Sequence, residues 1–147
     1  MKNLFIPPLL VLYSIILMTA SWFFLPEFNR IPFPVNFTGI AVAFSGFVLM
    51  GKSRDLFTKH KTTLAYDEPS YLITEGVFSK TRNPMYLGMF ILLLGIGLCF
   101  RNIFSVSTAL VFLLILHLGY VPREEKTMLK TFGQDYIKYR KNVRRWI

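Results

Sequence analysis

The chain has 147 residues, of which 53% are hydrophobic and 17% are charged, and its mean hydropathy is +0.45. Soluble domains carry about 25% charged residues, so this composition excludes an ordinary soluble domain and indicates a polytopic membrane protein. Cys99 is the only cysteine, which excludes a disulfide within these residues, and with only two histidines we expect no metal site.

Four apolar runs predict an all-α integral membrane protein with four transmembrane helices, at about residues 4–25, 35–51, 85–100 and 103–120. About 17–25 helical residues cross the bilayer core. The first run is too long for a signal peptide and no A-x-A cleavage site follows it, so we interpret it as a true span. Only Arg101 and Asn102 separate the last two runs, which predicts an antiparallel helical hairpin.

The basic residues predict the orientation of these spans. Fifteen of the seventeen Lys and Arg residues fall on one side: Lys2, six in the loop 52–84 and eight in the tail 121–147. Positively charged loops stay in the cytoplasm, so we expect both termini, that loop and the tail to be cytoplasmic. Orientation and attraction to anionic membrane lipids account for the net charge of +9, and we expect no nucleic-acid partner.

Small residues form stripes on two of the predicted spans. Gly39, Ala43 and Gly46 share one face of the second span, and Gly88 and Gly95 share one face of the third. Because small residues let membrane helices approach closely, we expect these stripes to pack against each other.

The stretch TRNPMYLG, residues 81–88, lies at the cytoplasmic mouth of the third span. Pro84 suits the first turn of a helix, where its missing N–H costs nothing. A hairpin returns the chain to the same side, so we expect Arg82 and Asn83 to meet Arg123 and the two glutamates that follow it.

Glu124 and Glu125 lack a basic residue at i+4, unlike most surface helix glutamates. Carboxylates this close to the lipid boundary usually have a function, and at an exposed edge they would contribute little to folding. His117 lies seven residues earlier on the same helical face, where a ligand role competes with a simple helix-to-helix hydrogen bond.

Beyond Glu125, helical spacing of apolar and basic residues predicts a C-terminal amphipathic helix in the membrane interface, with Gly133 marking a break.

Two segments resemble the isoprenylcysteine carboxyl methyltransferase family. LITEGVFSKTRNPMYLG, residues 72–88, is similar to its L-x-T-x-G-x-[YF]…R-[HN]-P-x-Y-x-G segment, and residues 123–147 are similar to its R-x-E-E-x-x-L…FG-x-x-Y-x-x-Y…V-x-R ending. Phospholipid N-methyltransferases share both blocks and add a G-x-G, which Gly95 and Gly97 provide here. Most of that family carries His where this chain has Asn83.

The resemblance implies S-adenosylmethionine as cofactor, with methylation of a lipophilic acceptor at the cytoplasmic membrane face. Either Arg82 or Arg123 would pair with a carboxylate of the cofactor or acceptor, and either Glu124 or Glu125 would accept hydrogen bonds from the cofactor. Tyr86 would border the acceptor, and His117 stays a candidate acceptor contact because of its position on the helical face of Glu124. The remaining cofactor contacts implied by the resemblance are Leu72, Thr74, Gly76, Phe78, Asn83, Pro84, Gly95 and Gly97.

Two other functions stay open at this point. Membrane sterol reductases share a related R-H-P-N-Y and acidic block but bind NADPH, and they are usually longer. A non-catalytic membrane scaffold could keep the fold without the activity. The sequence does not name the methyl acceptor, and the oligomeric state is unknown.

Overall fold

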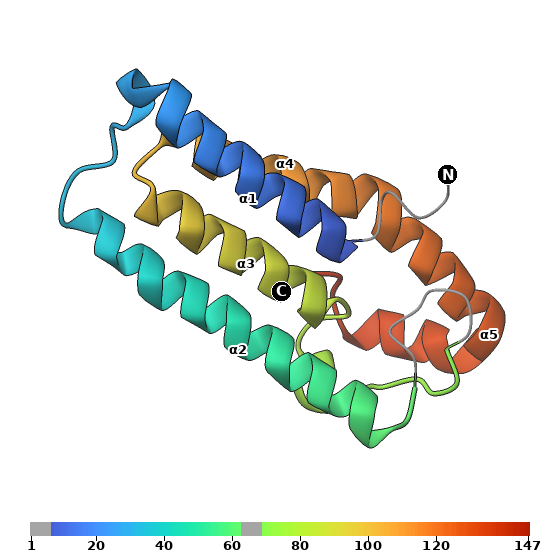
Figure 1. Ribbon diagram of the computed structural model, residues 1–147. Helices are drawn as coiled ribbons and strands as arrows, with labels where there is room; N and C mark the ends of the chain where they lie inside the picture. Colours follow the sequence, from blue (N-terminus) through green and yellow to red (C-terminus); the bar gives the residue numbers. More distant parts are fainter. Residues whose placement is uncertain (1–6, 63–68) are drawn as a thin grey trace.

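The computed structural model describes residues 7–62 and 69–147, and within these ranges every regular element is a helix. The long helices are α1 (Pro7–Phe24), α2 (Thr38–Lys59), α3 (Pro84–Cys99), α4 (Ile103–Ile115) and α5 (Val121–Asn142). Helices α1 to α4 run along one another, and α5 turns back at one end of the molecule (Figure 1). Three short 3-10 helices, η1 (Pro26–Phe28), η2 (Val35–Phe37) and η3 (Gly76–Ser79), lie in the links, and a π-helical turn, η4 (Leu116–Tyr120), joins α4 to α5.

The observed helices agree with the four apolar runs and correct some of their bounds. Helix α2 continues past residue 51 to Lys59, so the first part of the predicted loop 52–84 is helical. The fourth run does not end at residue 120, because α4, η4 and α5 form one continuous helical segment. Residues 4–6 of the first predicted span, Lys2, and residues 63–68 of the predicted loop lie outside the described residues.

Helix α3 is the centre of the structure, with α2 along one side and α4 and α1 along the other (Figure 1). The predicted pairing of the small-residue stripes is confirmed. A Cβ built on Gly95 would lie within 3.0 Å of backbone atoms of Gly39 and Ala43, and one on Gly46 would meet the backbone of Gly88 and Leu92. The α2 and α3 backbones therefore touch directly, which only small residues permit.

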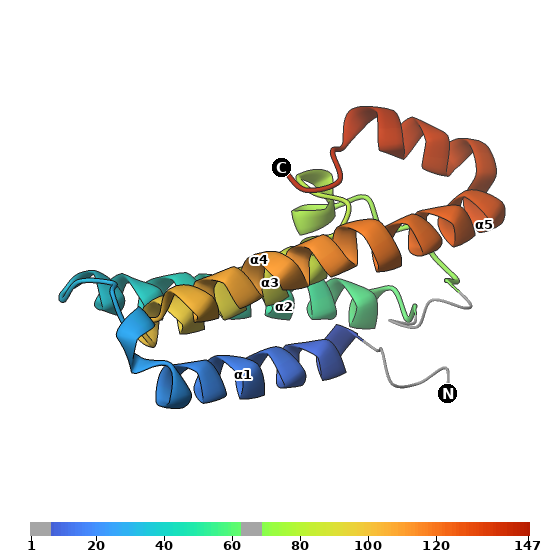
Figure 2. The same ribbon diagram turned by 90° about the horizontal axis from the view of Figure 1, so that it is seen from above.

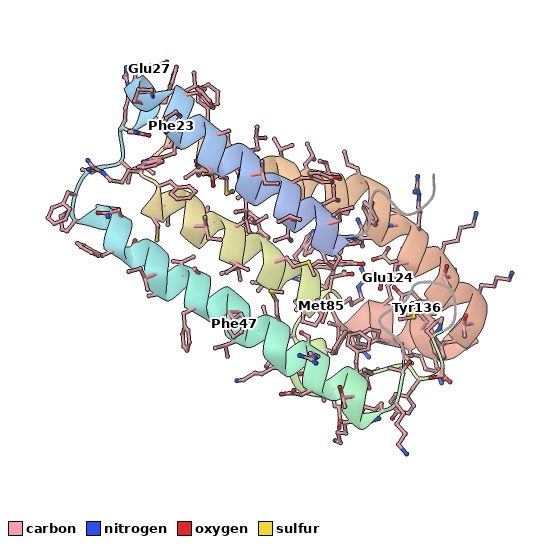
Figure 3. The ribbon with its side chains drawn as sticks, in the orientation of Figure 1. Phe23, Glu27, Phe47, Met85, Glu124 and Tyr136 are labelled. Atoms are coloured by element: carbon pink, nitrogen blue, oxygen red, sulfur yellow. The ribbon has the colours of Figure 1, made fainter. Side chains whose placement is uncertain are left out.

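An apolar core joins α3 to α1, α4 and the first residue of α5. The residues of this core are Met18, Tyr86, Met89, Leu93, Ala109, Phe112, Leu116 and Val121. Apolar side chains also cover the outside, such as Phe23 on α1 and Phe47 on α2, which are 69% and 64% exposed (Figure 3). A helix that is apolar all round suits a membrane rather than water.

Length and hydropathy support the same conclusion. Three helical segments within the described residues are long and apolar enough to cross a membrane: Pro7–Phe24, Val35–Lys59 and Ile103–Asn142. Helix α3 is equally apolar but shorter, with 16 residues.

The α3–α4 hairpin is fixed at its tip by a buried asparagine. Asn102 Oδ1 accepts a hydrogen bond from the Ser105 N–H at 3.2 Å, which caps α4. Its Nδ2 donates to Asn29 Oδ1 at 2.8 Å and to the carbonyl oxygens of Ser21 and Leu25. These bonds attach the hairpin to the end of α1.

Helix α5 bends sharply at Gly133, where the sequence predicts a break. Gly133 has φ 49° and ψ −118°, a conformation that residues with a Cβ rarely adopt. The second half of α5 consequently folds back toward the start of α3 (Figures 1 and 2). This reversal returns residues 143–147 to the predicted meeting point of residues 81–83 and α5.

Candidate functional site

An ion pair joins the segment before α3 to the beginning of α5. Arg82 Nη1 lies 3.0 Å from Glu125 Oε1, and the two side chains are 9% and 11% exposed. The same Nη1 donates to Tyr136 Oη at 3.3 Å. The predicted meeting of the two segments is therefore confirmed for Arg82 and Glu125.

A second arginine holds Glu125 from the other side. Arg145 Nε donates to Glu125 Oε1 at 3.0 Å and Arg145 Nη2 donates to Oε2 at 2.8 Å, a bidentate pair. This hydrogen bonding raises the pKa of Arg145. The expectation that Glu125 is an exposed-edge carboxylate is wrong, because the fold supplies two basic partners that are distant in sequence.

The second arginine of the cluster is Arg145 and not Arg123, which we expected there. Arg123 is exposed and stands outside the ion-pair cluster, and Arg145 occupies the place expected for it. Each residue of a helix turns the side-chain direction by about 100°, so Arg123 and Glu125, which are two residues apart, point to nearly opposite sides of α5.

Backbone contacts clamp residues 143–147 against the start of α3. The Arg82 N–H donates to the Arg144 carbonyl at 3.0 Å. The Arg145 carbonyl accepts from Thr81 Oγ1 and from Asn83 Nδ2, each at 3.0 Å. Asn83 thus uses its amide to hold the returning chain, and Pro84 behind it is the first residue of α3, as predicted.

His117 joins the cluster through the same returning segment. Trp146 Nε1 donates to His117 Nδ1 at 3.0 Å, and Arg145 Nη1 lies 3.4 Å from that nitrogen. Because an indole N–H can only donate, Nδ1 is the accepting nitrogen and the ring proton of a neutral His117 is assigned to Nε2.

Glu124 has a different environment from its neighbour. It lies near Tyr136 and the start of α3 (Figure 3), and Tyr86 on α3 forms a side-chain hydrogen bond with it. Its Oε2 atom is buried and has no hydrogen-bond partner among the described residues. Burial, opposed by the Tyr86 hydrogen bond and assisted by the charge of Glu125, raises the pKa of Glu124 from 4.5 to about 7.

One donor in the cluster is also unused. Arg82 Nε is buried without a hydrogen-bond partner among the described residues. Buried polar atoms normally find partners, so the unused acceptor on Glu124 and the unused donor on Arg82 are positions where a water molecule or a polar ligand would bind.

The loop that precedes α3 is held against α2 and α5 through Phe78. Gly76 has φ +58° and begins η3, where a side chain would be strained. The ring of Phe78 packs edge-to-face on Phe57 of α2, with 5.5 Å between centroids, and the Phe78 carbonyl accepts from Tyr139 Oη at 2.7 Å. Of the other predicted contacts here, Leu72 is half-buried and Thr74 is exposed.

The same loop is tied to the end of α2 by charge. Glu75 Oε1 lies 2.7 Å from Lys59 Nζ and 2.8 Å from His60 Nε2, and these hydrogen bonds lower the pKa of Glu75. The His60 ring stacks on Tyr71, with 4.2 Å between centroids.

Gly95 and Gly97 are not brought to the cluster. Gly95 faces α2, and a Cβ on Gly97 would lie 3.0 Å from backbone atoms of Ser105 and Val106 on α4. Neighbouring helices occupy the space beside both glycines, so we leave them out of the proposed site.

Sequence reasoning about single residues missed Arg145, Trp146 and Tyr136. Their contacts depend on the reversal at Gly133, which no helical periodicity predicts. The available signal was the ending of the chain, in which the Tyr136–Tyr139 pair and Arg145, two residues after Val143, stand at positions of the Y-x-x-Y…V-x-R pattern.

A family model described as phospholipid methyltransferase matches residues 35–135, which is more than half of the chain. A protein-S-isoprenylcysteine O-methyltransferase of Schizosaccharomyces pombe is 39% identical over 75 residues, a match that covers 49% of this chain and 30% of that protein. An uncharacterized protein of Haemophilus influenzae is 32% identical over 63 residues, which cover 43% of this chain and all of that protein.

The fold is similar to a solved membrane protein structure. The eukaryotic intramembrane Ras methyltransferase ICMT (isoprenylcysteine carboxyl methyltransferase), solved without a monobody, matches with a TM-score of 0.68 and 25% identity. The match covers 92% of this chain and 50% of that one. The chain therefore spans half or less of the two named methyltransferases that it matches, and it shares the helical membrane fold of the solved one.

Proposed function

This chain belongs to the phospholipid methyltransferase family, and from that premise we propose that it transfers a methyl group from S-adenosylmethionine to a lipophilic acceptor at the membrane surface. The observation that carries the proposal is the cluster at the start of α5, in which Arg82 pairs with Glu125 and the neighbouring Glu124 is buried against Tyr86. This cluster lies where the apolar helices end and the charged loop and tail begin.

The unused polar atoms of the cluster fit this cofactor. S-adenosylmethionine carries an ammonium group, ribose hydroxyls and a carboxylate beside its reactive sulfonium methyl group, which it supplies in an activated form. Glu124 Oε2 is suited to accept from the ammonium or from a hydroxyl, and Arg82 Nε is suited to donate to the carboxylate. Both atoms are buried, so these contacts would also exclude water.

The two glutamates take different roles in this proposal. Glu125 forms an ion pair with Arg82 and accepts two hydrogen bonds from Arg145, and these contacts use most of its acceptor capacity. Glu124 keeps a free oxygen. We therefore assign the main cofactor contact to Glu124, and we assign Glu125 to holding Arg82 in position.

The loop before α3, Tyr86 and His117 would line the approach to the cluster. Residues 72–78 stand at the cytoplasmic mouth and would cover the cofactor, with Gly76 allowing the turn. Tyr86 and His117 lie toward the apolar side, from which a lipid acceptor would come. An isoprenylcysteine-like carboxylate, a phospholipid amine and a related small molecule all fit this placement. For such a reaction, the protein mainly holds the two reactants in line and excludes water.

Four spans would place this site on the cytoplasmic face. The spans are α1, the apolar part of α2, α3, and α4 with η4 up to Tyr120, and α5 would lie in the interface. The basic residues of the loop and the tail then share one side with both termini, in accord with the positive-inside rule.

The test is methyl transfer by the purified protein in lipid nanodiscs. We expect labelled S-adenosylmethionine and a total lipid extract to give a methylated lipid, identified by mass spectrometry. The Glu124→Gln variant should lose at least tenfold in affinity for S-adenosylhomocysteine, or about 1.4 kcal/mol. Glu27→Gln is the matched control, since Glu27 is an exposed carboxylate at the far end of the molecule (Figure 3).

Ligand-dependent stability separates this proposal from its alternatives. S-adenosylhomocysteine should raise the unfolding temperature, because a ligand that binds only the folded state stabilises it. Stabilisation by NADPH instead would favour a reductase. No stabilisation by either compound and no methylated lipid would favour a non-catalytic scaffold and contradict the proposal.

A further inference from the structure

Resting on that proposed function, we propose that residues 143–147 form a strap across the cofactor site and that Arg145 is a positioning residue. It would act through Glu125, holding this carboxylate beside Arg82 and leaving the adjacent Glu124 oxygen free for the ligand.

The geometry of Glu125 supports this role. Its two oxygens are bound by the fork of Arg145, through Nε and Nη2, while Arg82 reaches Oε1 from the other side. A guanidinium fork fixes both the position and the plane of a carboxylate, which a single point charge does not. With Arg82 alone, Glu125 could rotate toward Glu124 or toward the ligand position.

Further contacts that do not use the Arg145 side chain also hold the strap in register. The carbonyls of Arg144 and Arg145 accept three hydrogen bonds from residues 81–83, and the Trp146 indole donates to His117. Contacts on both sides of Arg145 therefore present its guanidinium to Glu125. In return, the strap fixes the residues that carry Arg82 and begin α3.

The chain contains a matched control for the loss of this charge. Arg140 lies on the last turn of α5, five residues before Arg145, and its side chain is exposed. Arg140→Gln removes the same charged group from the same region without touching Glu125.

The first measurement is calorimetric titration with S-adenosylhomocysteine. We expect Arg145→Gln to weaken binding at least tenfold, Arg145→Lys to weaken it less because the charge remains without the fork, and Arg140→Gln to leave it unchanged. Wild-type affinity in both Arg145 variants would overturn the positioning role. If Arg145→Gln does not fold, Arg145→Lys still gives the comparison.

A double-mutant cycle tests whether Arg145 acts through Glu125. In a Glu125→Gln background, Arg145→Gln should cost little further affinity, because the group that it positions is already neutral. A loss as large as in the wild-type background would mean that Arg145 acts in another way and would overturn the proposal. A merely structural residue would show such independent costs.

A third measurement needs no ligand. Hydrogen exchange at the Arg82 amide reports on its bond to the Arg144 carbonyl. We expect faster exchange in Arg145→Gln than in Arg140→Gln or the wild type. Unchanged exchange in Arg145→Gln would contradict the strap, whether or not the protein binds S-adenosylhomocysteine. Failure of the wild type to bind S-adenosylhomocysteine would instead contradict the proposed function.

Discussion

Arg82 Nη1 lies 3.0 Å from Glu125 Oε1, and this contact links the segment before the central helix α3 to the beginning of α5. Both side chains are almost fully shielded from solvent. Removing one member of such a pair leaves the other charge buried and only partly compensated, which usually costs more than the intact pair contributes.

We therefore expect Arg82→Gln to lower the free energy of unfolding by about 3 kcal/mol. Denaturant titration of the purified protein in detergent measures this change, and Lys80→Gln is the control, since Lys80 is an exposed basic residue two positions earlier. Equal stability of the two variants would contradict the description of Arg82 as the centre of a buried ion-pair cluster.

The contact between α2 and α3 predicts a different response from two glycines. A Cβ on Gly95 would meet the backbone of Gly39 and Ala43 at less than 3.0 Å, whereas one on Gly51 would meet nothing within 4 Å. We expect Gly95→Ala to lower the free energy of unfolding by about 1–3 kcal/mol, because backbone atoms cannot move aside. Gly51→Ala should be neutral or raise it by up to about 1 kcal/mol, through helix propensity.

The same denaturant titration distinguishes the two glycine variants. A Gly95→Ala variant as stable as Gly51→Ala would mean that the helices separate at little cost. The close approach of α2 and α3 would then not be a main source of stability.

The sequence predicted those parts of the structure that depend on local pattern. The apolar runs predicted where the helices lie, and the small-residue stripes predicted the α2–α3 contact. The short link at Asn102 predicted a hairpin, and the hairpin predicted that Arg82 lies near Glu125. These inferences need only helical periodicity and a hairpin.

The remaining parts depend on long-range geometry. The bend at Gly133 was predicted as a break, but the path of the chain after it was not, so the partnership of Arg145 with Glu125 could not be derived. Arg123 was the second arginine expected at this meeting point, because the hairpin returns the start of the tail beside Arg82. The continuation of α2 to Lys59 was missed because hydropathy marks the end of an apolar run, not the end of a helix.

The proposed orientation predicts which side of the membrane each link faces. In a Cys99→Ala background, cysteines introduced at His60 and Arg140 should react with a membrane-impermeant reagent only from the cytoplasmic side. A cysteine at Glu27, at the opposite end of the molecule (Figure 3), should react only from the other side. Labelling of position 60 or 140 from outside would contradict a cytoplasmic site.

The raised pKa of Glu124 predicts a pH dependence of stability. Its pKa is about 7 in the folded chain and 4.5 in the reference state, so between these values the folded protein holds one more proton than the unfolded protein. The stability that Glu124 contributes is fully present below pH 4.5 and is lost as the pH rises to about 7. Glutamine does not titrate, so we expect Glu124→Gln to gain up to about 3 kcal/mol relative to the wild type across this window.

Denaturant titrations of both proteins at pH 5 and pH 8 measure this difference, and Glu27→Gln should follow the wild-type profile. Ligand binding should change in the opposite direction, because only the ionised carboxylate can accept from a cationic ligand through both oxygens. Wild-type affinity for S-adenosylhomocysteine should accordingly rise between pH 6 and pH 8, and that of Glu124→Gln should not. Parallel pH profiles for wild type and Glu124→Gln, in both stability and binding, would show that Glu124 is ionised throughout and would contradict its burial against Tyr86.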